Sequence, residues 1–294
     1  MDKIIKKYNI KTVEVLNKGW SNDKKYILDN KYLLRISDIS LYQKKKEQFE
    51  LLKEVAKLNI NSSKPIDFGI LEDGNVFMLL SYLEGEAAEE IIPNLNEKEA
   101  YDLGSEAGVV LRKLHSISIP EQNLSWYDRY MIKMPKKINN YLNCEYKISY
   151  GDMILKYYQD NYKLMEKRPL LFSHGDYHVG NMIVNNGKIG IIDFDKNNIA
   201  DPYDEFKPFC WNVMRNEYFE TGLINGYFNN NIPDDFFPIL KFYTAESLIS
   251  HITWAVTFGE KEIRTAYEIA ELQSAWWDNF KLDIPTWYKG ILFK

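Results

Sequence analysis

The sequence feature that most constrains the fold is a short hairpin in the second half of the chain. Two β-rich runs, 182–185 and 188–192, flank an Asn-Gly pair at 186–187, and such a pair is typical of a two-residue type I′ turn. With that turn, residue 185 pairs with residue 188, and the register can be counted back to the open end. The hairpin therefore predicts that Asn181 and Asp193 lie side by side there.

The side chains around this end of the hairpin suit phosphate chemistry. Asn181 and Asp193 offer hard oxygen donors, which suit Mg²⁺ held by one or two protein ligands and by substrate phosphates. Asp176 precedes Asn181 by five residues and follows His174, which is the spacing of the kinase catalytic loop and its metal-binding Asp. The pattern predicts phosphoryl transfer with Asp176 as the catalytic residue. The alternative, a structural histidine, a turn former and a strand cap, leaves the joint spacing unexplained.

Composition limits the class of protein further. A chain of 294 residues with 45% hydrophobic and 15% aromatic residues can pack a core and suits one large domain or two smaller ones. No apolar run reaches the roughly 18–20 residues that cross a bilayer, and the first residues lack the apolar core of a signal peptide. Cys144 and Cys210 are too few for a disulfide framework. These features predict a reduced, cytoplasmic protein without a membrane partner.

Charge is spread unevenly along the chain. Residues 1–60 contain 14 lysines and arginines against 8 acids, a net charge of +6, and the remainder contains 23 against 34, a net charge of −11. A basic first segment suits a nucleoside triphosphate, and an acidic remainder suits a cationic second substrate. A solvated surface of uneven charge explains the same counts equally well. No basic, aromatic-interleaved surface indicates a nucleic-acid partner.

Hydrophobic patterns divide the chain into two parts. The first part contains one amphipathic helix at 44–58 and short β-compatible runs at 13–16, 25–28, 32–36 and 76–80. From about Asn96 onward helical periodicity dominates and is interrupted by the hairpin. The sequence predicts an α+β fold. Residues 1–83 would form a small antiparallel-sheet lobe with one helix, and residues 84–294 a larger, mostly helical lobe that contains the hairpin.

Several segments resemble the aminoglycoside phosphotransferase family of protein-kinase-like antibiotic kinases. The resemblance is strongest over His174–Asn181 and Ile192–Phe194. Supporting segments follow in the family's order at Tyr32–Arg35, Met78–Gly85, Leu111–His115 and Asp201–Glu205. The resemblance spans most of the chain. It implies a protein-kinase-like bilobal fold with a nucleotide-binding N-terminal lobe and a catalytic, acceptor-binding C-terminal lobe.

The resemblance also implies roles in catalysis. Asp176 would orient the acceptor hydroxyl and accept its proton, while Asn181 and Asp193 would hold Mg²⁺ against the phosphates. Arg35 stands where the kinase pattern has lysine, and its guanidinium binds phosphate with a different geometry and reach. Its expected partner is Glu47 on the 44–58 helix, with Glu50, one turn away, as the rival.

The remaining nucleotide contacts are expected from backbone groups. The turn at 17–22 has a single glycine, yet its N–H groups and the Ser21 hydroxyl can cover phosphates. An ordinary hairpin turn explains the same residues. The backbone at Ser81 and Leu83 is expected to bond the purine of ATP or GTP, and the sequence does not discriminate between the two donors.

For the second substrate, the resemblance implies an aminoglycoside held by carboxylates. The candidates are Asp201, Asp204, Glu205 and Glu246. Asp204 or Glu205 can instead cap the following helix, because acids favour helix N-termini. The predicted function is transfer of the γ-phosphate of ATP or GTP to an aminoglycoside hydroxyl by a monomer, which would give antibiotic resistance.

Other functions remain open at this point. A kinase of a macrolide, choline, homoserine or a sugar derivative would use the same catalytic residues. A protein kinase is disfavoured because no Ala-Pro-Glu follows Asp193. An inactive, nucleotide-binding pseudokinase would explain Arg35, but the intact Asp176, Asn181 and Asp193 argue against it.

Overall fold

The computed structural model describes residues 1–17 and 23–293 and divides the chain into two compact units. The first unit consists of Met1–Ile91 and Asn181–Asp195, and the second of Ile92–Gly180 and Lys196–Lys294. This division differs from the expected boundary after residue 83. The reason is that β6 (Glu86–Ala87) pairs with β8 (Met182–Asn185), which joins the hairpin to the first unit.

The first unit is built on a five-stranded antiparallel sheet with the order β1-β2-β3-β5-β4. Its strands are β1 (Val13–Val15), β2 (Lys24–Leu28), β3 (Tyr32–Ser37), β4 (Pro65–Ile70) and β5 (Val76–Ser81). Four of them match the runs expected from the sequence. The fifth, β4, was missed because proline and glycine are uncommon in strands, and its place at the edge of the sheet is where they are tolerated.

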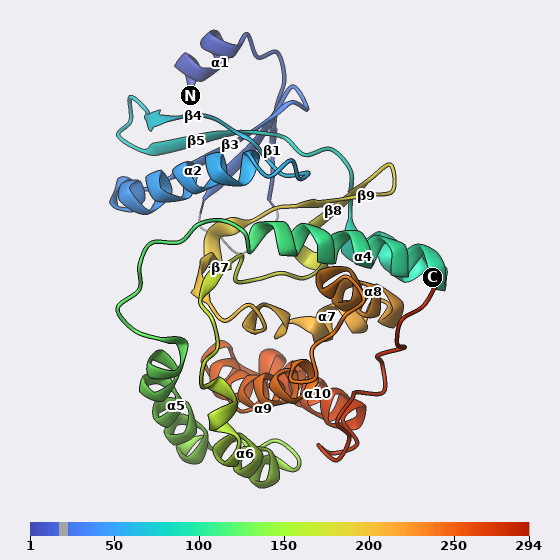
Figure 1. The fold of residues 1–294 in the computed structure, drawn as a ribbon. Helices are drawn as coiled ribbons and strands as arrows, with labels where there is room; N and C mark the ends of the chain where they lie inside the picture. Colours follow the sequence, from blue (N-terminus) through green and yellow to red (C-terminus); the bar gives the residue numbers. More distant parts are fainter. Residues whose placement is uncertain (18–22, 294) are drawn as a thin grey trace. The chain divides into compact units, whose positions relative to one another are not determined.

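Helices cover this sheet and bury its apolar residues. Helix α2 (Tyr42–Ala56) follows the 3₁₀ turn η1 (Ile39–Leu41) and packs along β4 and β5 (Figure 1). Helix α1 (Asp2–Tyr8) contributes Ile4 to a buried cluster. The other buried members of that cluster are Leu28, Leu34, Leu71 and Leu79. These contacts join α1 to the middle of the sheet.

A second, three-stranded sheet of the first unit holds the hairpin, in the order β6-β8-β9, with β9 spanning Lys188–Ile191. A short helix α3 (Ala88–Ile91) follows β6. Gly85 has φ +141°, and a Cβ at this position would lie 2.5 Å from the carbonyl oxygen of Val184. Glycine therefore lets the chain before β6 pass close to β8.

The second unit is mainly helical. Its helices are α4 (Glu97–Leu114), α5 (Trp126–Asn143), α6 (Gly151–Asp160), α7 (Phe209–Val213), α8 (Glu217–Phe228), α9 (Phe236–Ala255) and α10 (Glu260–Trp276). Two short strands, β7 (Leu171–Ser173) and β10 (Asn198–Ala200), pair antiparallel. Its 3₁₀ turns include η2 (Ile92–Asn94), η3 (Tyr162–Met165), η6 (Asp204–Phe206) and η7 (Val256–Phe258). Among the described residues, no helix has the length and apolarity needed to span a membrane.

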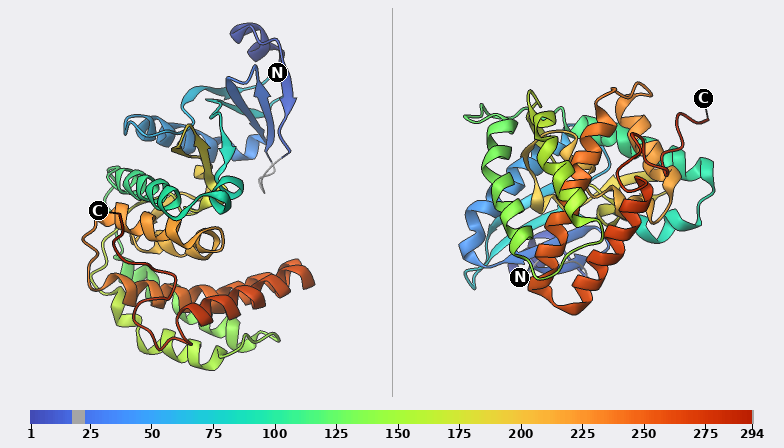
Figure 2. Two further views of the ribbon diagram at one scale, coloured as in Figure 1. Left: turned by 90° about the vertical axis from the view of Figure 1, so that its right-hand side faces the viewer. Right: turned by 90° about the horizontal axis from the view of Figure 1, so that it is seen from below.

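Helices α4 and α8 pack with their backbones in direct contact (Figure 2). A Cβ added to Gly104 or Gly108 of α4 would lie 2.0 Å from a carbonyl oxygen of α8. A Cβ added to Gly222 or Gly226 of α8 would lie 2.1 Å from a carbonyl oxygen of α4. Only glycine allows this approach, so the four positions fix how closely α4 and α8 pack.

Candidate active site

The register of the hairpin is confirmed. Strands β8 and β9 pair from Asn185↔Lys188 to Met182↔Ile191, and the N–H of Ile192 donates to the carbonyl of Asn181 at 3.0 Å. The two turn residues have φ of 50° and 70°, and two positive φ angles are the mark of a type I′ turn. Asn181 and Asp193 therefore lie at the open end of the hairpin, within the first unit.

Asp193 has the features of a residue held for a ligand. Its backbone is left-handed, with φ 63°, a conformation that non-glycine residues adopt at a cost. Its Oδ1 atom is buried and has no hydrogen-bond partner among the described residues. Together with the amide oxygen of Asn181, this carboxylate fits Mg²⁺, which needs few protein ligands when phosphates complete its coordination. In the described part of the chain, no group of three or more His, Cys, Asp or Glu side chains is placed to bind a metal.

Arg35 lies on β3 and is buried, but its partner is not the expected one. Its Nε and Nη2 atoms donate to Asp23 Oδ2 at 2.9 and 2.6 Å, and Nη2 also donates to Asp195 Oδ2 at 2.5 Å. Lys45 of α2 donates to the same Asp23 oxygen at 2.7 Å, and Gln48 donates to Asp195. We refer to these five residues as the Arg35 network.

The expected pairing of Arg35 with Glu47 is therefore wrong. Glu47 is exposed and accepts a hydrogen bond from Gln43 at 2.8 Å, and its rival Glu50 pairs with Lys53. The reason is the phase of α2: its buried face carries Lys45, Gln48, Phe49, Leu52 and Val55. The apolar positions of this helix already placed residues 45 and 48 on the inner face, so the helical period was the signal that could have found them.

Burial and charge act against each other in the Arg35 network. Burial disfavours the ionised form of Asp23, but Arg35 and Lys45 outweigh it and hold the pKa of Asp23 below its usual value. In the same way, burial opposes ionisation of Asp195, while Arg35 and Lys45 lower its pKa. Two buried cations, the buried carboxylate of Asp23 and the half-buried carboxylate of Asp195 thus form a neutral group.

The backbone segment expected to meet the purine lies at the end of β5. The N–H of Ser81 is already used, because it donates to the carbonyl of Lys64 at 2.8 Å. The backbone of Leu83 makes no hydrogen bond to the described residues. Among the described residues, Leu83 therefore has an unused donor and acceptor, whereas the N–H of Ser81 is already bonded. Ser21 of the expected phosphate-covering turn lies outside the described residues.

Asp176 lies in the second unit, in the loop of residues 174–180 that follows β7, which we call the Asp176 loop. Lys196 donates to its Oδ2 at 3.0 Å, and Nε2 of His178 lies 3.6 Å from its Oδ1. The N–H of Gly180 donates to Nδ1 of His178 at 3.1 Å, so the proton of the neutral ring is on Nε2 and faces Asp176. The sequence assigned no role to His178 and did not identify Lys196.

These contacts keep Asp176 ionised. Burial favours the neutral acid, but His178 and Lys196 outweigh it and hold the pKa of Asp176 well below its usual range. A carboxylate of such low pKa is a weak base and a good hydrogen-bond acceptor. The residue is therefore better suited to orienting a hydroxyl than to removing its proton early in a reaction.

The Asp176 loop is anchored from below by buried hydrogen bonds. Glu205 of η6 accepts from the Ser173 hydroxyl and from the N–H of Gly175 at 2.8 Å. The Tyr177 hydroxyl donates to the carbonyl of Ala107 on α4 at 2.7 Å. The N–H of Val179 donates to Asn212, which in turn donates to Glu220 at 2.7 Å. Glu205, expected to bind the acceptor, is thus a buried support of the loop.

The other acidic residues expected to bind the acceptor are also engaged. Asp201 is fully buried and accepts from Arg168 Nη2 at 2.9 Å and from the Tyr243 hydroxyl at 2.7 Å. Asp204 pairs with Lys207 at 2.5 Å. Glu246, 1% exposed, is surrounded by three lysines. These are Lys133, Lys137 and Lys207.

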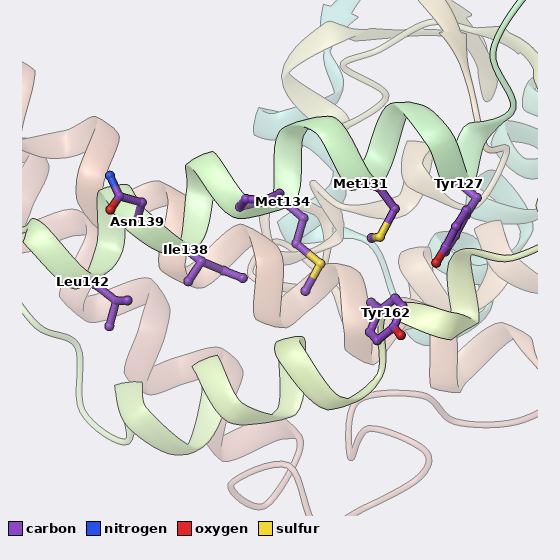
Figure 3. A pocket seen from close by; sticks show the side chains of 8 residues that line it. Tyr127, Met131, Met134, Ile138, Asn139, Leu142 and Tyr162 are labelled. Carbon is purple, nitrogen blue, oxygen red and sulfur yellow. The ribbon is translucent and has the colours of Figure 1, made fainter.

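One open cavity of about 540 Å³ lies along α5 and η3 (Figure 3). Met131, Met134 and Ile138 point into it from α5, and Tyr162 closes one side. Its lining is mainly apolar, and it includes none of the residues expected to act in catalysis or binding. The cavity therefore gives no support to the expected acceptor-binding residues.

Several solved structures with the same fold are of aminoglycoside phosphotransferases. The GDP complex of wild-type aminoglycoside 2′-phosphotransferase-IIIa has a TM-score of 0.72 at 17% identity, over 92% of this chain and 96% of that chain. The streptomycin–ATP–APH(2″)-IIa ternary complex has a TM-score of 0.64 at 18% identity, over 92% and 94%. A thermostable APH(4)-Ia variant with ADP and hygromycin B has 0.66 at 15% identity, over 92% and 96%.

The predicted α+β, kinase-like fold is confirmed by these likenesses, and the chain is a phosphotransferase. It belongs to the phosphotransferase enzyme family (APH), whose model matches residues 12–231. No curated protein sequence matches the chain. The family predicted from the Asp176 and hairpin motifs is thus confirmed, whereas the acceptor is a separate question.

Proposed function

We propose that this phosphotransferase moves the γ-phosphate of ATP or GTP to a hydroxyl of a small molecule, with Mg²⁺ as cofactor. The observation that carries the proposal is the ionised Asp176, fixed by Lys196 and His178 five residues before Asn181. The buried Oδ1 of Asp193 at the end of the hairpin supports it. ATP, ADP and GDP complexes among the related structures support a nucleotide donor.

In the proposed reaction Asp176 accepts a hydrogen bond from the acceptor hydroxyl. As that oxygen attacks the γ-phosphorus, the bond from phosphorus to the β–γ bridging oxygen breaks, the nucleoside diphosphate leaves and the hydroxyl proton passes to Asp176. Because the transition state is loose, alignment contributes more than proton removal. Asn181 and Asp193 would hold Mg²⁺, which when bound neutralises charge on the β- and γ-phosphates.

Arg35 and Leu83 would bind the nucleotide itself. The Nη1 atom of Arg35 donates no hydrogen bond to the described residues, so its two N–H groups remain for a phosphate. The unused backbone groups of Leu83 suit the edge of a purine. Adenine and guanine present different donors and acceptors at that edge, and the assay below separates them. We place the enzyme in the cytoplasm, in keeping with the free Cys144 and Cys210, and expect it to be a monomer.

An aminoglycoside is the first candidate acceptor. The related structures include complexes with streptomycin, gentamicin, kanamycin and hygromycin B. The net charge of −11 after residue 60 favours a cationic molecule. Phosphorylation of such an antibiotic would give resistance.

A specific observation favours a second candidate, a less cationic small molecule. The four acids expected to hold an aminoglycoside are each engaged: Asp201 with Arg168, Asp204 and Glu246 with lysines, and Glu205 with the Asp176 loop. A polycation would have to displace these partners. A macrolide, a sugar derivative, choline or homoserine needs fewer free carboxylates.

A nucleotide-consumption assay tests the function and separates the two candidates. ATP and GTP are supplied separately, with Mg²⁺, to panels of aminoglycosides, macrolides, choline, homoserine and simple sugars. Phosphorylated product from any of them supports the small-molecule kinase, and its identity decides the acceptor class. Absence of product from every acceptor, together with absence of nucleotide binding, would falsify the proposal.

A further inference from the structure

Helix α2 approaches Arg35 with a cation, not with an acid. Lys45 and Gln48 lie on the buried face of α2 and donate to the two carboxylates of the Arg35 network. The Lys45 side chain is 7% exposed, as is that of Arg35, and the Asp23 side chain between them is 4% exposed. Two buried cations would repel each other, so the carboxylate of Asp23 is what allows them to lie together.

Both oxygens of Asp23 accept hydrogen bonds, from three residues of two elements. One of its oxygens accepts from Arg35 and from Lys45, and the other accepts from the Ser37 hydroxyl at 2.6 Å. Arg35 and Ser37 lie on β3 and point to the same side of the sheet, and Lys45 comes from α2. These bonds hold the Asp23 side chain in a single orientation. Asp23 itself lies directly before β2.

The bonds of Asp23 also fix the orientation of Arg35. Both Nε and Nη2 are held by one carboxylate oxygen, which sets the plane of the guanidinium. Nη1, at the remaining corner, donates to none of the described residues and is available for a ligand. Lys45 adds a positive charge that offsets Asp23, so the arginine is held by an acid without losing its attraction for a polyanion.

We propose that Asp23 and Lys45 are positioning residues for Arg35: Lys45 fixes Asp23, and Asp23 aims the guanidinium at the phosphates of the nucleotide. Helix α2 thus controls the phosphate-binding side chain through the bridging carboxylate of Asp23, which lies directly before β2. This inference rests on the proposed function, because it assumes that Arg35 binds a nucleoside triphosphate. It makes a distinct claim about residues that the catalytic motif does not contain.

The test compares substitutions on the two faces of α2. Lys45→Met removes the buried cation, and the matched control Lys46→Met removes an exposed one from the adjacent position. Measurements are the Kd for ATP or GTP with Mg²⁺ by titration calorimetry, KM and kcat with an accepted acceptor, and the unfolding midpoint. We expect Lys45→Met to raise the nucleotide Kd and KM about tenfold with kcat changed less than threefold. The reason is that Asp23 loses its charge-assisted hydrogen bond from Lys45 and no longer fixes Arg35. Lys46→Met should match the wild type.

Two further variants separate positioning from stability. Lys45→Arg keeps a cation that can reach Asp23 and should restore the nucleotide Kd to within about threefold of the wild type. Lys45→Glu places three carboxylates around Arg35 and should weaken nucleotide binding most. Adding Asp23→Asn to Lys45→Glu should recover much of that loss, because the acid on α2 can then hold Arg35 directly. This recovery keeps the test decisive if Lys45→Met does not fold.

The outcomes distinguish this inference from the proposed function. If the wild type binds nucleotide but Lys45→Met and Lys46→Met have the same Kd, the positioning role is wrong and the kinase assignment stands. If Lys45→Met lowers only the unfolding midpoint, the cluster is merely structural and the inference is again overturned. If the wild type binds neither ATP nor GTP, both proposals fall together.

Discussion

The Asp176 loop and the Arg35 network both hold charged side chains in place, but they do so by different means. The loop is held by neutral donors: the backbone N–H groups of Gly175 and Val179 and the Tyr177 hydroxyl donate to buried partners in the second unit. The network is held by charge, with two cations and two carboxylates brought together from the residue before β2, from β3, from α2 and from the segment after β9 in the first unit. Backbone bonds survive most side-chain changes, whereas a buried charge group depends on every member.

The largest effect is expected where a side chain meets the backbone of the loop. Gly175 has φ +82°, and a Cβ there would lie 2.1 Å from the carbonyl oxygen of Lys196. Gly175→Ala should lower the free energy of unfolding by about 3 kcal/mol and reduce turnover at least about tenfold, because strain and a backbone clash combine.

Gly187→Ala is the matched control for this change. Its φ is +70°, but nothing lies within 4 Å of the added Cβ, so the cost should be about 1 kcal/mol. Urea unfolding of both variants makes the measurement. Equal losses would show that backbone conformation alone, not the close approach to Lys196, decides the effect.

The next effect concerns the buried support of the loop. Burial raises the pKa of Glu220 to about 8, although the hydrogen bond from Asn212 opposes this. The folded state therefore keeps a proton that the unfolded chain releases above about pH 4.5, so the contribution of Glu220 to stability is greatest below that pH and declines as the pH rises towards 8. Between pH 5 and pH 8 the wild type should lose about 3 kcal/mol of unfolding free energy that Glu220→Gln retains. Identical pH slopes in urea unfolding would contradict this account of the loop support.

A smaller effect is expected at the charge that flanks Asp176. Lys196→Met removes the lysine cation that, together with the hydrogen bond from His178, lowers the pKa of Asp176, so that pKa should rise. Because the neutral acid cannot orient the hydroxyl, the acid limb of kcat/KM should move to higher pH by about one unit. Lys113→Met, at an exposed position on α4, serves as the control. If the acid limb of kcat/KM stays at the wild-type pH, Lys196 does not lower the pKa of Asp176.

The smallest effect is expected at the residue first chosen as the partner of Arg35. Glu47→Gln should leave the nucleotide KM and the unfolding midpoint within experimental error, because Glu47 is exposed and bonds only Gln43 among the described residues. Michaelis–Menten kinetics with ATP and GTP make the measurement. A severalfold rise in KM would restore Glu47 as a nucleotide-site residue and reduce the importance of Asp23.

The contrast between the two regions also explains what could be predicted from the sequence. The hairpin register followed from one Asn-Gly turn and a count of residues, since strand pairing next to a tight turn is a local property. The partner of Arg35 depends on which face of α2 meets the sheet and on Asp23, twelve residues earlier in the chain. The helical period of α2 indicates which of its faces meets the sheet, but no local pattern marks Asp23 as buried.

The acceptor side was the least predictable for a related reason. Acidic residues near a catalytic motif suggest a cation-binding pocket, but the same carboxylates can be consumed by internal partners. Lys133, Lys137 and Arg168 come from segments far from Glu246 and Asp201 in the chain. Their pairing depends on tertiary packing that composition does not encode.

The central claim is that Asp176 serves the acceptor while the Arg35 network serves the nucleotide. Its most direct test measures ATP or GTP binding with Mg²⁺ and single-turnover transfer on Asp176→Asn, using the acceptor that the wild type phosphorylates fastest. The account predicts a nucleotide Kd within about threefold of the wild type and transfer at least about 10³-fold slower. Transfer at the wild-type rate in Asp176→Asn would contradict it.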